Sequence, residues 1–186
     1  MANWFTPYLV PRDSLLALRQ SASAVERIEK AIHEHYEEPW GPDEPECMTP
    51  LPTWREAIQA LLQGDQRLIQ QDGHWTVYVA VAIAIADMLS MDGKDLDDLR
   101  YDELPGTLYP PCRFLPGIRL RQRPEEWFYL SYLTPFHVAT EIRHAQSELR
   151  WCKAETNPEW NRGIREYLHW LKTAQKRHAH LAISFS

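Results

Sequence analysis

The sequence predicts a single α+β domain over residues 1–186, mainly helical, with a small sheet that includes the N- and C-terminal strands. Three observations lead to this prediction. An apolar segment at 75–91 has the composition and spacing of a helix buried on most of its circumference. Short segments at 4–10, 127–133 and 180–185 are rich in the aromatic and β-branched residues that strands favour. The chain is also long enough to bury one core without disulfides or metal.

The segment WTVYVAVAIAIADMLSM (75–91) is the element around which the rest is expected to pack, because thirteen of its first fifteen residues are apolar. It is too short to span a bilayer, which takes about 20 apolar residues, and Asp87 interrupts it. Val and Ile alternate with Ala along it, which also fits a central strand, but its length and Ala content favour a helix. Gly93 is expected to end the helix in a left-handed conformation.

Two helices are expected between the first strand and residue 36. Pro7 indicates an edge position for the strand, and Pro11 suits the first turn of the helix that follows. Ser23 and Glu26 have the spacing of a capping box for the second helix. The apolar stripes of the two helices are formed by Leu15, Leu16 and Leu18 and by Val25, Ile28 and Ile32.

Prolines mark two segments as irregular. Segment 37–52 contains five and is expected to be a long extended loop, whereas 104–126 contains five more and supports no prediction of its structure. Thr53 and Glu56 have capping-box spacing for a short helix that Gly64 ends. An acidic loop with one helical turn is expected after the central helix, up to residue 103.

The second half predicts a helical hairpin between two strands. Thr134–Pro135 and Asn157–Pro158 each place an N-cap residue before a proline at the first helical position. The buried faces are expected to be Val138, Ile142, Ala145, Leu149 and Cys152 in one helix and Trp160, Ile164, Tyr167, Leu168 and Leu171 in the other. Trp54, Trp75, Trp160 and Trp170 are all expected to be packing residues.

The chain contains an internal echo, YLVP at 8–11 and YLTP at 132–135, 124 residues apart. Each copy ends an expected strand and begins a helix. Chance and an internal duplication both explain three matches in four positions.

Several stretches resemble a known group of proteins. The opening PYLVPRDSLLAL, the apolar helix after Gly73 and above all WFYLSYLTPFHVATEI and REYLHWLKTAQKRHAHLAISF resemble the uncharacterised bacterial proteins grouped as domains of unknown function akin to YfbM. There a strand ending in a Tyr-Leu or similar pair leads into a helix, and a helix ending in basic residues leads into a C-terminal strand. The resemblance covers most of the chain and implies an α+β intracellular bacterial protein with no assigned activity. It transfers no functional residues, and segments 37–52 and 119–123 depart from its pattern.

The charge of the chain is divided unequally. Residues 1–103 hold 8 Lys/Arg and 19 Asp/Glu, whereas 104–186 hold 12 and 7, for a net charge of −6. The halves either form a dipole or complement each other across the fold. Such an acidic chain is not expected to bind nucleic acid. No charged-then-apolar leader precedes Trp4, and Cys47, Cys112 and Cys152 show no paired spacing, so free thiols and a cytoplasmic location without membrane association are expected.

The function predicted from these features is protein binding. Trp40 lies beside Asp43, Glu44 and Glu46 in the proline-rich loop, and an exposed Trp among carboxylates is typical of an interface anchor. The alternative is a loop held to the body by its one large apolar side chain. We expect a non-enzymatic protein of the immunity or regulatory type that offers this acidic surface to a basic protein partner. Phosphate-binding loops and nucleophile motifs are missing from the sequence, so an enzyme is the less favoured interpretation and no cofactor is expected.

A second hypothesis rests on the only basic run. Arg119, Arg121 and Arg123 alternate with apolar residues, which places them on one side of an extended segment. An enzyme or a binder of an anionic small molecule, with a cleft near these arginines and His137, is the alternative function.

Histidines raise the question of a metal site. His137, Glu141, His144 and Glu148 form one stripe on the helix that begins at Pro135, a pattern that fits either zinc ligands or a solvated polar face. His178 and His180 are expected to point to one side of the last strand, beside the basic end of a helix. The solvated interpretation is favoured in both places, and no metal is expected.

Overall fold

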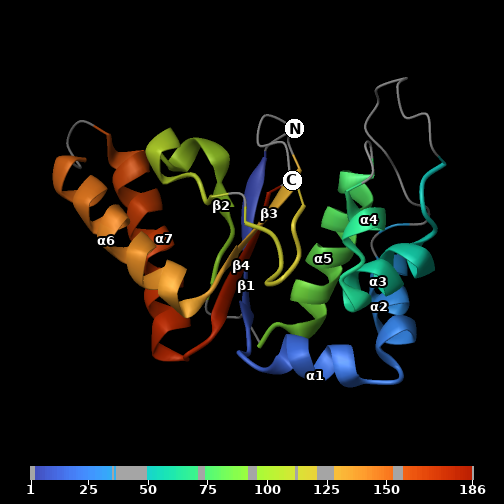
Figure 1. Ribbon diagram of the computed structural model, residues 1–186. Coiled ribbons are helices and arrows are strands. Elements are labelled where there is room, and N and C mark those ends of the chain that lie inside the picture. The colour runs from blue at the N-terminus through green and yellow to red at the C-terminus, as the bar shows by residue number, and fades with distance from the viewer. Residues whose placement is uncertain are drawn as a thin grey trace.

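The computed structural model describes residues 3–34, 36, 50–70, 74–91, 96–111, 113–120, 128–152 and 157–185 (Figure 1). It confirms the α+β fold: a four-stranded antiparallel sheet stands between two groups of helices. The strands are β1 (Trp4–Val10), β2 (Leu99–Arg100), β3 (Tyr129–Leu133) and β4 (His180–Phe185). The helices are α1 (Ser14–Gln20), α2 (Ala24–His33), α3 (Trp54–Gln63), α4 (Gln66–Ile69), α5 (Trp75–Leu89), α6 (Pro135–Trp151) and α7 (Pro158–Lys176), with 3₁₀ turns η1 (Tyr101–Glu103) and η2 (Gly106–Leu108).

The N- and C-terminal strands pair with each other, as the sequence predicts. The strand order is β2-β1-β4-β3, and every neighbouring pair is antiparallel. β4 is therefore an inner strand, hydrogen-bonded to β1 from Phe5 opposite Phe185 to Val10 opposite His180, and to β3 on its other side.

The internal echo corresponds to an equivalence in the sheet. Tyr8 and Tyr132 both lie opposite Ala182, and Leu9 and Leu133 both lie opposite Leu181. Because β1 and β3 are both antiparallel to β4, they run in the same direction on either side of it. The two Tyr-Leu pairs thus occupy matching places, and each strand leads into a helix.

The pleat of the sheet separates two apolar clusters, because successive side chains of a strand point to opposite faces. The cluster with α6 and α7 contains the strand residues Phe5, Leu9, Leu133 and Leu181. The cluster with α1, α2, α3 and α5 contains Val10, Leu130, Tyr132 and Ala182. Figure 1 shows α6 and α7 on one side of the strands and α2, α3 and α5 on the other.

The central apolar segment is the helix α5, so the rival interpretation as a strand is wrong. It packs on α2, α3, β1 and β3, and such all-round contact requires an apolar residue at nearly every position. The predicted stop at Gly93 is also wrong, because α5 ends at Leu89 and Ser90 is extended. The backbone N–H of Met91 donates to the carbonyl of Leu9 on β1 (2.8 Å), which draws the chain toward the sheet before residue 93.

The predicted cap of α3 is confirmed and that of α2 is not. The Thr53 N–H donates to Glu56 Oε2 (2.8 Å), the Glu56 N–H donates to Thr53 Oγ1 (3.3 Å), and Gly64 ends α3 with φ of 70°. Ser23 makes no side-chain cap; its hydroxyl instead lies 3.2 Å from that of Ser21. At the N-terminus of α2, the contact between the Ser21 and Ser23 hydroxyls thus takes the place of the expected capping box between Ser23 and Glu26.

Other expectations need correction. Leu16 and Trp160 are 59% and 41% exposed, although both were expected in apolar stripes, because α1 and α7 each turn only one side toward the core. β1 is not an edge strand, but β2 pairs only with Trp4 and Phe5, so Pro7 lies beyond β2 and interrupts no hydrogen bond with it. His178 lies in a turn with φ of 51° before β4 begins, so it does not share a strand face with His180.

Among the helices that the structure describes, none combines the length and the apolar character needed to cross a membrane.

Candidate functional site

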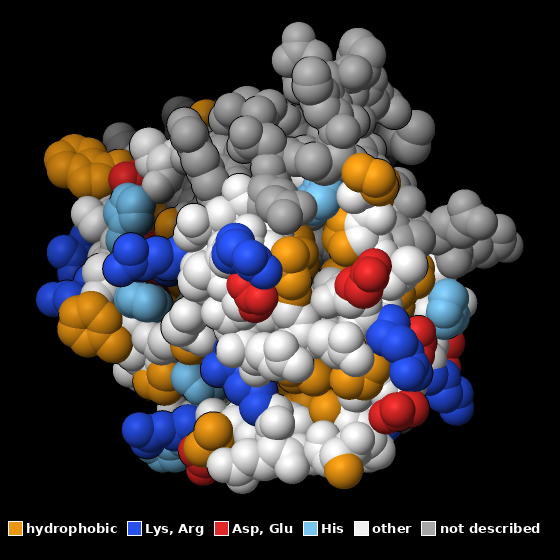
Figure 2. Space-filling model, turned by 45° about the vertical axis from the view of Figure 1, so that its right-hand side comes forward, with side chains coloured by type: hydrophobic (Ala, Val, Ile, Leu, Met, Phe, Trp, Pro, Cys, Tyr) orange, Lys and Arg blue, Asp and Glu red, His pale blue; other side chains and the backbone are white. Residues whose placement is uncertain are grey.

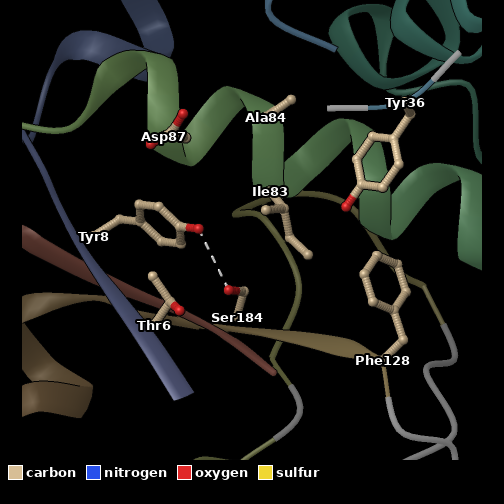
Figure 3. Close-up of a pocket in the computed structure, with 8 residues that line it drawn as sticks. All are labelled: Thr6, Tyr8, Tyr36, Ile83, Ala84, Asp87, Phe128 and Ser184. Carbon is tan, nitrogen blue, oxygen red and sulfur yellow. Dashed lines mark hydrogen bonds between the residues drawn. The ribbon is translucent and has the colours of Figure 1, made fainter. Parts of the chain in front are cut away.

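A pocket of about 160 Å³ lies between the sheet and the C-terminal half of α5 (Figure 3). Within the described part of the chain, five places contribute to it: β1, β4, α5, the third residue after the end of α2 and the residue before β3. The lining residues are Thr6, Tyr8, Tyr36, Ile83, Ala84, Asp87, Phe128 and Ser184.

The sheet places hydroxyl groups in this pocket. Phe5 and Leu9 of β1 face α6 and α7, so Thr6 and Tyr8, which alternate with them, point to the other face of the sheet, toward α5. Ser184 of β4 lies opposite Thr6 and shares this face. Ser184 is only 4% exposed and lies on the floor of the pocket. Polar side chains thus interrupt a sheet face that is otherwise part of the core.

The side of α5 that lines the pocket is the side of this helix that is not fully buried. Ile83, Ala84 and Asp87 are at spacings of one and four residues, which places them on the same side of α5. Ile83 is half-buried and Asp87 is exposed, whereas most other positions of α5 are buried. The carboxylate therefore lies at the solvent side of the pocket and Ser184 at its inner side.

The phenol of Tyr8 connects the two walls. Its hydroxyl lies 3.4 Å from the hydroxyl of Ser184, and Figure 3 shows Asp87 on the helix above the Tyr8 ring. Burial raises the pKa of Tyr8 above 10, the hydrogen bond with Ser184 opposes this, and the carboxylates of Asp87 and Asp98 add to the increase. Tyr8 is therefore an uncharged phenol at neutral pH.

The other end of the pocket is aromatic. Figure 3 shows Tyr36 and Phe128 on the far side of Ile83 from Tyr8. The Tyr36 N–H donates to the Ile32 carbonyl (2.8 Å), which extends the last turn of α2, and its ring contacts Trp54 at a centroid distance of 6.1 Å. Burial raises the pKa of Tyr36, so this phenol is uncharged as well.

The lining therefore has a defined chemical character. Its described residues supply one carboxylate, three aromatic rings and two aliphatic hydroxyls. The hydroxyl of Ser184 is paired with a phenol and not with a histidine or a carboxylate, so the arrangement has no activated nucleophile. These groups suit the binding of a ligand.

A second hollow of about 370 Å³ lies beside α2 and α3, and it is more open. Its charged residues satisfy each other, because the Arg55 guanidinium donates to Glu29 (2.9 Å) and both are accessible to solvent. Ion pairs exposed to solvent contribute little free energy, so this pair does not by itself mark the hollow as a binding site.

The predicted partner-binding residues Trp40, Asp43, Glu44 and Glu46 lie outside the described residues, so that prediction stays open. The same holds for Arg121 and Arg123. Arg119 is exposed, and its backbone N–H donates to the Gln66 side chain on α4 (3.1 Å).

His137 is positioned by a different arginine. Its Nε2 lies 3.3 Å from the Arg113 guanidinium, and its Nδ1 accepts a hydrogen bond from the Thr134 N–H (3.4 Å). Burial and then Arg113 lower the pKa of His137, with Glu141 opposing them. No contact among the described residues joins His137 to Arg119. Arg113 was missed because it stands 24 residues before His137 in an irregular segment.

The polar stripe on α6 makes one contact within itself and others with neighbouring elements. His144 pairs with Glu141 (3.8 Å), and Glu148 accepts a hydrogen bond from Thr107 on η2 (3.2 Å). Within the described part of the chain, no three His, Cys, Asp or Glu side chains are grouped to hold a metal ion.

Figure 2 shows basic and acidic side chains interspersed over the face that it presents. Eight of the nineteen acidic residues of 1–103 lie outside the described residues. The charge asymmetry of the sequence is therefore not reproduced as a patch of one sign on this face.

Comparison with known proteins found no matching family model, no matching curated protein and no matching solved structure. The resemblance to the YfbM-like group stays a prediction, and the function is inferred from the geometry of the pocket.

Proposed function

We propose that the protein binds a small organic ligand in the pocket between β1, β4 and α5. The observation that supports this most is the division of the lining into a hydroxyl-bearing end at Tyr8 and Ser184 and an aromatic end at Tyr36 and Phe128 (Figure 3). Ligand sites combine apolar walls with a few converging polar groups that orient the ligand.

The volume limits the ligand. Pockets for drug-sized molecules measure roughly 300–1,000 Å³, whereas a cavity of about 150 Å³ accommodates benzene. At about 160 Å³ the pocket matches a molecule of that size, with part of it extending toward Asp87 and solvent.

The test is a nuclear magnetic resonance screen with small cationic, neutral and anionic fragments. Binding fragments should shift the backbone amides of Ser184 and Asp87. Ile83→Trp, which adds bulk at the centre of the pocket, should abolish these shifts. Leu16→Trp adds bulk at an exposed position of α1 and should leave them unchanged. Absence of any selective shift, or shifts that survive in I83W, would refute the proposal.

Binding of a basic protein through Trp40, Asp43, Glu44 and Glu46 is a separate proposal, supported only by the composition of that segment. Joint replacement of the four residues is expected to abolish capture of a basic partner without changing the melting temperature. Capture at the wild-type level would remove this proposal.

A further inference from the structure

We propose that the outer surface of the helical hairpin formed by α6 and α7 binds the surface of an anionic phospholipid membrane. This inference is independent of the pocket, and it departs from the expectation, drawn from the sequence alone, of no membrane association. Two features support it. Basic side chains lie along the exposed sides of both helices, and strongly exposed aromatic rings lie at the two ends of α6.

The exposed side of α7 carries a row of basic residues. The buried side of this helix includes Ile164, Tyr167 and Leu171, and the helical repeat of 3.6 residues places the row opposite them. At 1.5 Å per residue, the row extends over about 21 Å. It consists of five exposed residues at spacings of three and four positions, namely Arg162, Arg165, His169, Lys172 and Lys176.

The row has one sign of charge. Beyond its first turn, where Glu159 is favoured by the helix dipole, α7 contains a single acidic residue, Glu166. Glu166 is half-buried, and its Oε1 accepts a hydrogen bond from Trp170 Nε1 (3.1 Å). The solvent-facing side of a helix usually mixes acidic and basic residues, which pair at spacings of three and four. A row of basic residues alone therefore indicates an anionic partner.

Most of this charge is not neutralised inside the protein. Arg162 forms an ion pair with Glu103 of η1. Arg165 donates to a neutral side chain one turn earlier on its own helix (2.9 Å). Lys172 and Lys176 form no ion pair with any residue that the structure describes. The second half of α7 thus presents positive charge that a partner can use.

α6 adds positive charge beside this row. The two helices pack against each other and contribute to the same apolar cluster, so their exposed sides both point away from it (Figure 1). Arg143 and Arg150 are exposed on α6, and Arg143 donates to the neutral hydroxyl of Thr140 (3.4 Å). The acidic residues of α6, Glu141 and Glu148, are half-buried. Six Arg and Lys side chains are therefore exposed on two adjacent helices.

The aromatic rings at the ends of α6 suit a membrane interface. Phe136 is 77% exposed and Trp151 is 83% exposed, and they stand about 22 Å apart along the helix axis. Phe136, Arg143 and Arg150 follow each other at intervals of seven residues, so they share one side of α6. Aromatic side chains are favoured at the level of the lipid headgroups, where arginines bind phosphate. With α6 parallel to the membrane plane, both rings enter the interface together.

A membrane fits this surface better than an acidic protein or a nucleic acid does. Ion pairs that stay exposed to solvent contribute little to binding an acidic protein, whereas an anionic leaflet attracts every Lys and Arg held near it. Single-stranded nucleic acid is usually held in a positively charged groove. Here the side chains project from the outward sides of two neighbouring helices, which a flat layer of headgroups reaches at once.

The experiment is sedimentation of the full chain with lipid vesicles at low ionic strength. Vesicles of equal parts phosphatidylcholine and phosphatidylglycerol should bind it at least about 10-fold more tightly than vesicles of phosphatidylcholine alone. Added salt should weaken this binding. Equal binding to both kinds of vesicle, or no binding, would overturn the inference. Tighter binding of an RNA or DNA oligonucleotide than of the anionic vesicles would also overturn it.

A matched pair of double variants separates this surface from net charge. Lys172→Gln with Lys176→Gln should weaken binding to the anionic vesicles about 10- to 30-fold. Arg27→Gln with Lys30→Gln removes the same charge from exposed positions of α2, in the other helical layer, and should bind as wild type. All four side chains are exposed, so both variants should keep the wild-type melting temperature. An equal loss in the two variants would attribute binding to net charge, and the inference would fail.

Tryptophan fluorescence gives a second readout. Emission of the wild-type protein should shift to shorter wavelength on the anionic vesicles as the exposed ring leaves water. Trp151→Phe should remove most of this shift, although seven other tryptophans remain. A shift of the same size in W151F would show that α6 does not face the membrane. None of these measurements involves the pocket, so their failure would leave the proposed function intact.

Discussion

Gly163, inside α7, is expected to be a glycine because of packing and not because of its own backbone conformation. A Cβ atom built on it would lie 2.0 Å from the carbonyl oxygen of Glu103 and 2.7 Å from its carbonyl carbon. These are backbone atoms of η1, which packs directly on α7, and an Arg162–Glu103 ion pair links the same two elements. Relief of the contact therefore requires movement of η1 away from the helix.

Two opposing terms decide the effect of Gly163→Ala. In an unobstructed helix, alanine stabilises by about 1 kcal/mol relative to glycine. Extra bulk in a well-packed interior costs about 1–3 kcal/mol, and a contact of 2.0 Å with backbone places this site at the upper end. We expect a net loss of about 2 kcal/mol, which lowers the melting temperature by about 4–8 °C in a chain of this size.

The assay is urea and thermal unfolding followed by circular dichroism. Gly106→Ala is the matched control, because its Cβ would meet nothing nearer than Tyr109 Cε2 at 4.0 Å, and it should remain close to wild type. The denaturant slope should be unchanged in both variants, so that midpoints report stability. A G163A protein as stable as wild type, or more stable, would refute the packing argument.

Three further predictions concern other parts of the fold. Thr53→Ala removes the capping box with Glu56 and should cost about 1 kcal/mol in urea unfolding; an unchanged midpoint would contradict it. Burial raises the pKa of Tyr78 to about 12, so the stability that its neutral form contributes is complete below pH 10 and is lost as the pH rises from 10 through 12. Between pH 9 and 11, Tyr78→Phe should therefore lose about 1 kcal/mol less stability than wild type, and equal losses would be the contrary result. Added Zn²⁺ should leave the melting temperature within about 1 °C, because the Arg113 guanidinium stands against Nε2 of His137, and a rise of several degrees would show metal binding at the stripe.

Local signals predicted most of the helices and strands. α7 begins at Pro158 behind an Asn157 cap, where the sequence places its start. The residues that fix such a helix boundary, a capping side chain or a proline, lie within a few positions of it. The end of α5 was predicted incorrectly because its determinant is a hydrogen bond from Met91 to Leu9, 82 residues earlier in the chain.

The candidate site was much harder to predict. Its lining residues stand between positions 6 and 184, and no two from different elements share a sequence motif. The one local signal was Asp87, the only charged residue in an otherwise apolar segment. The predicted cleft near Arg119, Arg121, Arg123 and His137 stays a prediction, since Arg121 and Arg123 lie outside the described residues; among the described residues, Arg113 is the arginine beside the imidazole.

The sequence by itself determined most of the helices and strands and most of their apolar positions, because capping, chain stiffness and hydrophobic periodicity act over a few residues. Only the tertiary structure decided that β4 lies between β1 and β3, that Gly163 touches Glu103 and that Tyr8, Asp87 and Ser184 line one pocket. These contacts join residues far apart in the chain, and their free energy is gained only when the whole core closes.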